Sequence, residues 1–180
     1  MLLVLAGCGK PTPEAQAKKT AEIFINALDA GDTAKAKEQS SEDVQKMCDA
    51  IESSFKTPTG FSTSADLSDD AKKKLAEIEK EIRTSSFENP QIKEVKEVNE
   101  RKYEVIFSMD YLNTTEIQKK DGKEAATKYM MEKLVENIYS VYTENFKNKE
   151  YTNEDSVITL EQQDDGKWFV TDIKGTNQNK

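Results

Sequence analysis

Apolar residues recur at helical spacing along the first half of the chain and predict three helices. These helices are expected over residues 14–30, 33–56 and 68–83, with a break in the second at 40–41 and a turn-rich loop over 57–67. Each helix carries one apolar stripe that predicts a buried face. The stripes consist of Ala21, Phe24, Ile25 and Leu28, then Val44, Met47, Cys48, Ile51 and Phe55, and then Ala71, Leu75, Ile78 and Ile82.

The second half of the chain mixes strand and helix patterns. Residues 91–98 predict a ragged strand, and residues 102–112 alternate apolar and polar side chains, as a half-buried strand does. A helix is predicted over 121–148, and a hairpin follows with strands over 156–162 and 167–173. The apolar face of that helix is expected to contain Met131, Leu134, Val135, Ile138, Val141, Tyr142 and Phe146.

The order of these elements predicts the fold class. Helices gathered before an antiparallel sheet indicate an α+β protein rather than a doubly wound sheet. We expect N-terminal helices packed on a curved antiparallel sheet, with an extra helix between two strand pairs. One domain is predicted over residues 14–174, and the polar residues 175–180 are expected to be a disordered tail.

Composition and charge exclude several classes of function. The net charge is −8, which repels phosphate backbones, so nucleic-acid binding is not expected. The chain has no histidine, so it lacks the commonest general base and the commonest metal ligand. Catalytic triads, cysteine–histidine dyads and histidine-ligated zinc sites are thereby excluded, and no cofactor is expected.

The N-terminus carries the most specific motif in the chain. The apolar run Leu2–Leu5 leads into Ala6, Gly7 and Cys8, and Leu5-Ala6-Gly7-Cys8 resembles a bacterial lipobox. By that resemblance, the Cys8 thiol receives diacylglycerol and becomes the first residue of the mature, membrane-anchored protein outside the cytoplasm. Two acyl chains anchor a protein stably, at about 0.8 kcal/mol for each buried CH₂ group.

The residues around Cys8 divide the N-terminus into a signal-peptide remnant and a tether. Residues 1–7 are fewer than a full signal sequence needs and contain no basic residue, so we expect the true start upstream. Residues 8–13 are short, polar and proline-bearing, which suits a lipid-anchored tether. With Cys8 lipidated, Cys48 would be a free thiol, and its place in an apolar stripe predicts a core residue.

Two further stretches suggest a family. One is the end of the first helix, running from Leu28-Asp29-Ala30-Gly31-Asp32 into the next helix, and the other is Asp165-Gly166-Lys167-Trp168-Phe169-Val170. Together they resemble the cystatin-like lipoproteins built on the cone of the nuclear-transport-factor-two-like proteins. The resemblance implies a curved sheet with a pocket on its concave side. That scaffold hosts enzymes, binding proteins and dimerisation modules alike.

The leading functional hypothesis is a non-catalytic module at the cell surface. Its partner would be a small apolar ligand, a cell-envelope protein or a second copy in a homodimer. Four aromatic residues are candidates to line a ligand pocket, with a plain core role as the alternative for each: Tyr103, Phe107, Tyr111 and Trp168.

Two alternatives belong to other classes. A small cone-fold isomerase or dehydratase would use Asp110 with Tyr103 or Tyr111, although Asp110 alternates to the opposite face of its strand. A calcium site would draw its oxygen ligands from one of two aspartate pairs, but neither has the spacing of an EF-hand loop. These pairs are Asp29 with Asp32 and Asp164 with Asp165.

Overall fold

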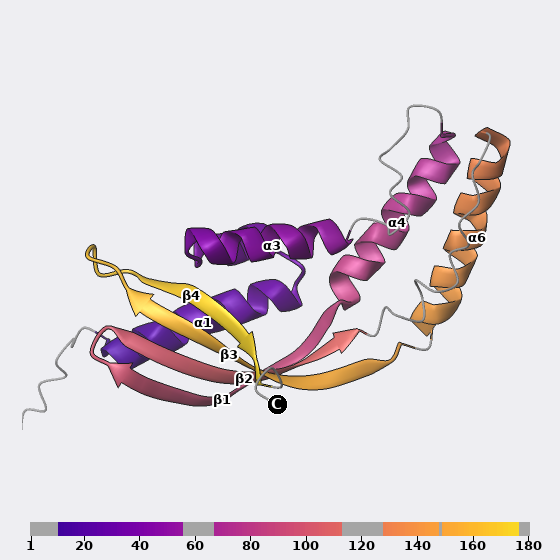
Figure 1. Cartoon of the computed structure of the whole chain (residues 1–180). Helices are drawn as coiled ribbons and strands as arrows, with labels where there is room; N and C mark the ends of the chain where they lie inside the picture. The colour runs from indigo at the N-terminus through magenta and orange to yellow at the C-terminus, as the bar shows by residue number, and fades with distance from the viewer. Residues whose placement is uncertain (1–10, 56–66, 113–127, 148, 177–180) are drawn as a thin grey trace, which may run out of the picture.

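The computed structural model describes residues 11–55, 67–112, 128–147 and 149–176, and confirms the α+β class. Helices precede an open antiparallel sheet, and one further helix separates the two strand pairs (Figure 1). In chain order the elements are α1 (Pro13–Asp29), α2 (Thr33–Glu38), α3 (Glu42–Phe55), α4 (Asp69–Ser85), β1 (Phe87–Asn99), β2 (Lys102–Leu112), α6 (Lys128–Lys147), β3 (Tyr151–Gln162) and β4 (Trp168–Gly175).

The four strands form one sheet in the order β1-β2-β3-β4, with every neighbouring pair antiparallel. The pairing of β2 with β3 brings the two predicted strand pairs together across the α6 insertion, with Val105 opposite Ile158. The sheet is curved, and α1 lies across one face in contact with all four strands (Figure 1). Because strand side chains alternate between faces, that face is apolar and the other is largely polar.

The core between α1–α3 and the sheet is one continuous cluster, and we call this part of the molecule the body. Of the α4 and α6 side chains that the structure describes, none belongs to the cluster. Its buried members are Ala17, Ala21, Phe24, Ile25, Ala27, Leu28, Ala36, Val44, Cys48, Tyr103, Val105, Phe107, Met109, Ile158, Leu160, Trp168 and Val170.

The predicted break in the second helix has a structural reason. Asp32 caps α2, its carboxylate accepting from the Lys35 backbone N–H at 3.0 Å, and the helix ends after Glu38. The chain then runs beside β4: the Val170 N–H donates to the Gln39 carbonyl, and the Ser41 N–H donates to the Val170 carbonyl. Residues 39–41 therefore cover part of the outer edge of β4, which would otherwise be unpaired.

Helices α4 and α6 form a second region, the arm, which projects beyond one end of the sheet (Figure 1). Two small apolar clusters hold the arm together. One consists of Phe55, Ile78, Ile82, Ile138 and Tyr142, and the other of Leu67, Ala71, Leu75 and Val135. Phe55 and the half-buried Phe87 pack edge-on at 6.3 Å and connect the arm to the body.

A polar clasp also joins the two regions. The Arg83 guanidinium on α4 makes a bidentate ion pair with Glu52 on α3, both bonds 2.7 Å long, and donates to the Gly31 carbonyl at 3.2 Å. Gly31 has a φ of +66°, and a Cβ there would lie 2.5 Å from Arg83 Cγ. Thr33 completes the clasp by donating its hydroxyl to the Glu52 carboxylate at 2.7 Å.

Some sequence predictions need correction. The apolar stripe predicts a buried Met47, but this side chain is 41% exposed, because α3 presents Val44, Cys48 and Phe55 to the core instead. Strands β1 and β3 begin at Phe87 and Tyr151, earlier than their patterns predict, because antiparallel pairing along β2 extends them.

Other predictions lie partly or wholly outside the described residues. They are the loop over 57–66, the first residues of the helix predicted from 121, the tail over 177–180 and the segment containing Cys8.

Candidate functional site

The arm owes its local structure to ordinary helix signals. The Ser68 hydroxyl caps α4 by accepting from the Ala71 N–H at 3.3 Å, and Asp69 and Asp70 lie in the first turn, where they favour the helix dipole. Leu75, Ile78 and Ile82 recur along the buried face of α4 and pack toward α6. This packing leaves a groove between the two helices, on the exposed side of the apolar contact.

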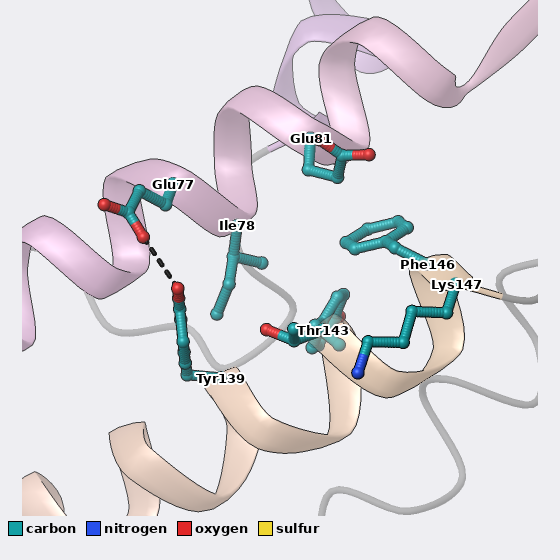
Figure 2. Close-up of a pocket in the computed structure, with 8 residues that line it drawn as sticks. Glu77, Ile78, Glu81, Tyr139, Thr143, Phe146 and Lys147 are labelled. Atoms are coloured by element: carbon teal, nitrogen blue, oxygen red, sulfur yellow. Dashed lines mark hydrogen bonds between the residues drawn. The ribbon is translucent and has the colours of Figure 1, made fainter.

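The groove encloses about 320 Å³ and combines aromatic, aliphatic and charged side chains (Figure 2). Its volume lies at the lower end of the range for small-molecule sites, roughly 300–1,000 Å³. A few polar groups set against apolar walls are the usual composition of such sites. The lining residues are Glu77, Ile78 and Glu81 from α4 and Tyr139, Tyr142, Thr143, Phe146 and Lys147 from α6.

One end of the groove carries a hydrogen-bonded acid. The Tyr139 hydroxyl donates to Glu77 Oε2 at 2.8 Å (Figure 2). The hydrogen bond to the Glu77 carboxylate raises the pKa of Tyr139, so the phenol keeps its proton across the physiological range. Lys74 lies 6.0 Å from the centre of the Tyr139 ring, but its ammonium pairs with Asp70 at 2.8 Å.

The other end of the groove carries two lysines. Lys149 pairs with Glu81 at 3.0 Å, donates to the Ser85 hydroxyl at 2.6 Å and lies 5.8 Å from the centre of the Phe146 ring. Lys147 is exposed, and among the described residues it makes no ion pair or hydrogen bond. The groove therefore has an acidic end, an apolar middle and a basic end.

A second hollow, of about 590 Å³, lies between α1 and the β3–β4 turn. It is more open than the arm groove, with Gln16, Lys19 and Lys167 on its walls. Trp168 also lines it, but the indole Nε1 is buried, has no hydrogen-bond partner among the described residues and has almost no exposed surface through which to meet a ligand.

The four aromatic pocket candidates lie in the body rather than in the arm groove. Tyr103, Phe107 and Trp168 are buried in the main core, where Tyr103 packs edge-on against Trp168 at 5.4 Å. Tyr111 is half-buried and packs against the same cluster, 5.6 Å from Phe87. Of these residues only Trp168 borders one of the two hollows described above.

Asp110 has the environment of a structural carboxylate. It accepts from the side-chain amides of Asn89 at 2.8 Å and Asn153 at 2.6 Å, so it links β1, β2 and β3. These hydrogen bonds lower the pKa of Asp110. A general acid needs the opposite shift, because it must hold its proton near neutral pH.

The aspartates of the two calcium candidates serve mainly as caps and ion-pair partners. Asp32 caps α2, Asp164 pairs with Arg101 at 2.8 Å, and Asp165 accepts from the Lys167 N–H at 3.0 Å. Within the part of the chain that the structure describes, no three acidic, cysteine or histidine side chains lie close enough together to hold a metal ion.

Sequence reasoning missed the groove residues Glu77, Tyr139 and Lys147. Three groove residues of α6 follow one another at i+4 spacing: Tyr139, Thr143 and Lys147. They lie beside the apolar stripe of the helix, at the edge of its buried face. The spacing could have shown that they form one row along the helix. It could not show that α4 places Glu77 and Glu81 across from that row.

No protein-family model matches the chain, and no curated protein matches it. The crystal structure of a candidate lipoprotein, YcdA from Bacillus subtilis, is similar with a TM-score of 0.45 and 14% identity, over 86% of this chain and 51% of that protein. The chain thus spans about half the length of YcdA. Among the described residues, no helix is long and apolar enough to cross a membrane.

Proposed function

We propose that this chain is an extracytoplasmic lipoprotein, anchored through lipid on Cys8, whose folded domain binds a ligand without catalysis in the α4–α6 groove. The observation that carries the binding role is the groove itself, with its aromatic walls and its opposed charges. The resemblance of Leu5-Ala6-Gly7-Cys8 to a lipobox carries the anchor. The cystatin-like family is part of this proposal as the scaffold that the body resembles.

The start of the folded domain is compatible with a short anchor. Helix α1 begins at Pro13, and the Thr12 hydroxyl caps it by accepting from the Ala15 N–H at 3.2 Å. Residues 9–12 separate this helix from Cys8, and four residues reach at most about 14 Å when extended. A lipid on Cys8 would therefore hold the body near the bilayer.

Two observations favour binding over catalysis. The carboxylate proposed for an isomerase, Asp110, is held ionised by two amide donors and lies outside the groove. In the groove, Glu77 accepts from Tyr139 and Glu81 pairs with Lys149, so each carboxylate already has a partner within the protein.

The anchor is tested by expressing the full gene in its own host, with Cys8 intact or changed to Ala. We expect the wild type to partition into detergent and to incorporate a labelled fatty acid, while Cys8→Ala does neither. A wild type that stays in the aqueous phase and takes up no label would refute the anchor.

The groove is tested by native mass spectrometry of the full chain taken from host membranes in detergent. We expect the wild type to retain a non-covalent mass, and Thr143→Trp to lose it by filling the groove. Ser140→Trp is the matched control, since Ser140 is exposed on α6 but does not line the groove. Equal retention by all three proteins would place the ligand elsewhere.

A further inference from the structure

We infer that the ligand of the α4–α6 groove is a short extended peptide, with its free amino terminus at Glu77, an apolar side chain in the middle and its carboxylate at Lys147. This inference rests on the proposed binding function and assigns the chemical class of its ligand. Three independent features of the groove support it: a site for a cation, a site for an anion, and the distance between them.

The site for a cation is the acidic end. Glu77 is exposed and uses Oε2 to accept from Tyr139, while Oε1 has no partner among the described residues. An ammonium group placed there meets a carboxylate oxygen and the nearby Tyr139 ring, the two kinds of surface that attract organic cations. Lys74, whose ammonium lies 6.0 Å from the centre of the Tyr139 ring, is already occupied by Asp70 and lies 3.7 Å from Glu136.

The site for an anion is the basic end. Lys149 is held by Glu81 and Ser85, which leaves Lys147 as the lining ammonium without a partner in the described chain. Lys147 lines the groove, and Figure 2 shows its side chain running back along α6 toward Thr143. A carboxylate there would gain a charge-assisted hydrogen bond.

The distance between the two ends sets the length of the ligand. Tyr139 and Lys147 are eight positions apart on α6, which corresponds to about 12 Å at a rise of about 1.5 Å per residue. Because the Lys147 side chain turns back along the helix, this backbone separation is an upper bound on the distance between the charges. An extended peptide advances about 3.3–3.6 Å per residue, so at most roughly three residues fit between the charges. Ile78 and Phe146 line the middle, where an apolar central side chain would pack.

Isothermal titration of the full chain in detergent with the tripeptide alanyl-leucyl-alanine tests this inference. N-acetylation of the peptide should weaken its binding to the wild type about fivefold, and should change nothing in Glu77→Gln. C-terminal amidation of the peptide should likewise weaken its binding to the wild type about fivefold, and should change nothing in Lys147→Met. Glu144→Gln, an exposed position on α6 outside the groove, is the control and should bind every peptide as the wild type does.

The possible outcomes separate the inference from the function beneath it. The assigned orientation is supported if N-acetylation loses its effect only in Glu77→Gln and C-terminal amidation loses its effect only in Lys147→Met. Failure of the free tripeptide to bind, or binding that ignores both substitutions, overturns the peptide assignment. If a mass is still retained by the wild type and lost in Thr143→Trp, the groove keeps its binding role and only the ligand class is wrong.

Discussion

The body and the arm of this molecule differ in how much apolar surface supports them. Among the side chains that the structure describes, the main cluster of the body has seventeen buried members, whereas the two clusters that hold the arm together have five and four. Because apolar burial is the main stabilising term in folding, the body can hold its shape without the arm, but the arm needs its attachment to the body. The body therefore supplies most of the stability, and the less strongly supported arm carries the groove.

The attachment combines aromatic and polar contacts. Phe87 packs edge-on against Phe55 on one side and Tyr111 on the other, which connects the arm cluster to the sheet. The Arg83–Glu52 clasp joins α4 to α3. We therefore expect the arm to open locally at lower free energy than the body unfolds, as regions with small cores do.

The largest expected effect comes from truncating the body core. Phe107→Ala should reduce the free energy of unfolding by about 3–5 kcal/mol, because Phe107 is fully buried in the main cluster. Its counterpart in the arm, Ile138→Ala, should speed hydrogen exchange in α4 and α6 while leaving the strands protected. Uniform loss of protection in Ile138→Ala would show that the two regions unfold as one.

A smaller effect is expected at the turn beneath the clasp. Gly31→Ala should cost about 1–3 kcal/mol, because alanine is strained at a φ of +66° and its Cβ would overlap the Arg83 Cγ and carbonyl oxygen. Urea denaturation measures the loss. Gly166→Ala is the control for the backbone cost alone, since its φ is +84° but no atom lies within 4 Å of the added Cβ. Equal losses at both sites would exclude a contribution from the clasp.

Neutralising the clasp should cost less again. Glu52→Gln should destabilise the protein by about 1 kcal/mol, a value reduced for solvent screening because both side chains are roughly one-third exposed. The matched substitution Asp43→Asn removes a pair with Lys46 that is far more exposed, and should change stability less than Glu52→Gln does. Thermal unfolding distinguishes the two. A larger loss for Asp43→Asn would contradict the role given to the clasp.

The smallest expected effect is a pH dependence of the stability that Asp110 contributes to the body. Since hydrogen bonds from Asn153 and Asn89 lower the pKa of Asp110, its ionised form stabilises the fold above the unfolded value of about 3.8. That contribution is lost as the pH falls through the lower folded pKa. The stability gap between wild type and Asp110→Asn should therefore narrow between pH 5 and pH 3 in urea titrations. A gap independent of pH would mean that the hydrogen bonds do not favour the carboxylate.

The sequence predicted the body better than the arm, for physical reasons. Helix α1 and strand β2 each bury one regular face, so the periodicity of the sequence identified their buried side chains. For β2 it also identified the first and last residues of the strand. Strand β1 was placed late because its first residues, from Phe87 to Pro90, include Asn89 at a φ of +55° and a shift in register against β2. The start of such an irregular strand is set by its pairing with the neighbouring strand, here β2, and not by its own sequence pattern.

The candidate site was the hardest part to predict. Aromatic residues suggested a pocket, yet Phe107 and Tyr103 are buried because an alternating strand turns its largest side chains toward the core. The groove depends instead on how α4 and α6 pair, and no local pattern relates Glu77 to Tyr139 across 62 residues. Cys48 was predicted correctly as a buried free thiol, because its place in the α3 stripe determines its surroundings.

The central claim is that the arm binds the ligand and the body supports it. Methyl NMR of the full chain in detergent tests this most directly, by adding the dialysable small-molecule fraction of the host culture. Ile78 and Ile138 report on the arm, and Ile25 and Ile158 report on the body. If the arm binds the ligand, the methyl signals of Ile78 and Ile138 shift while those of Ile25 and Ile158 stay unchanged. Shifts confined to Ile25 and Ile158 would contradict it and place the binding site in the body.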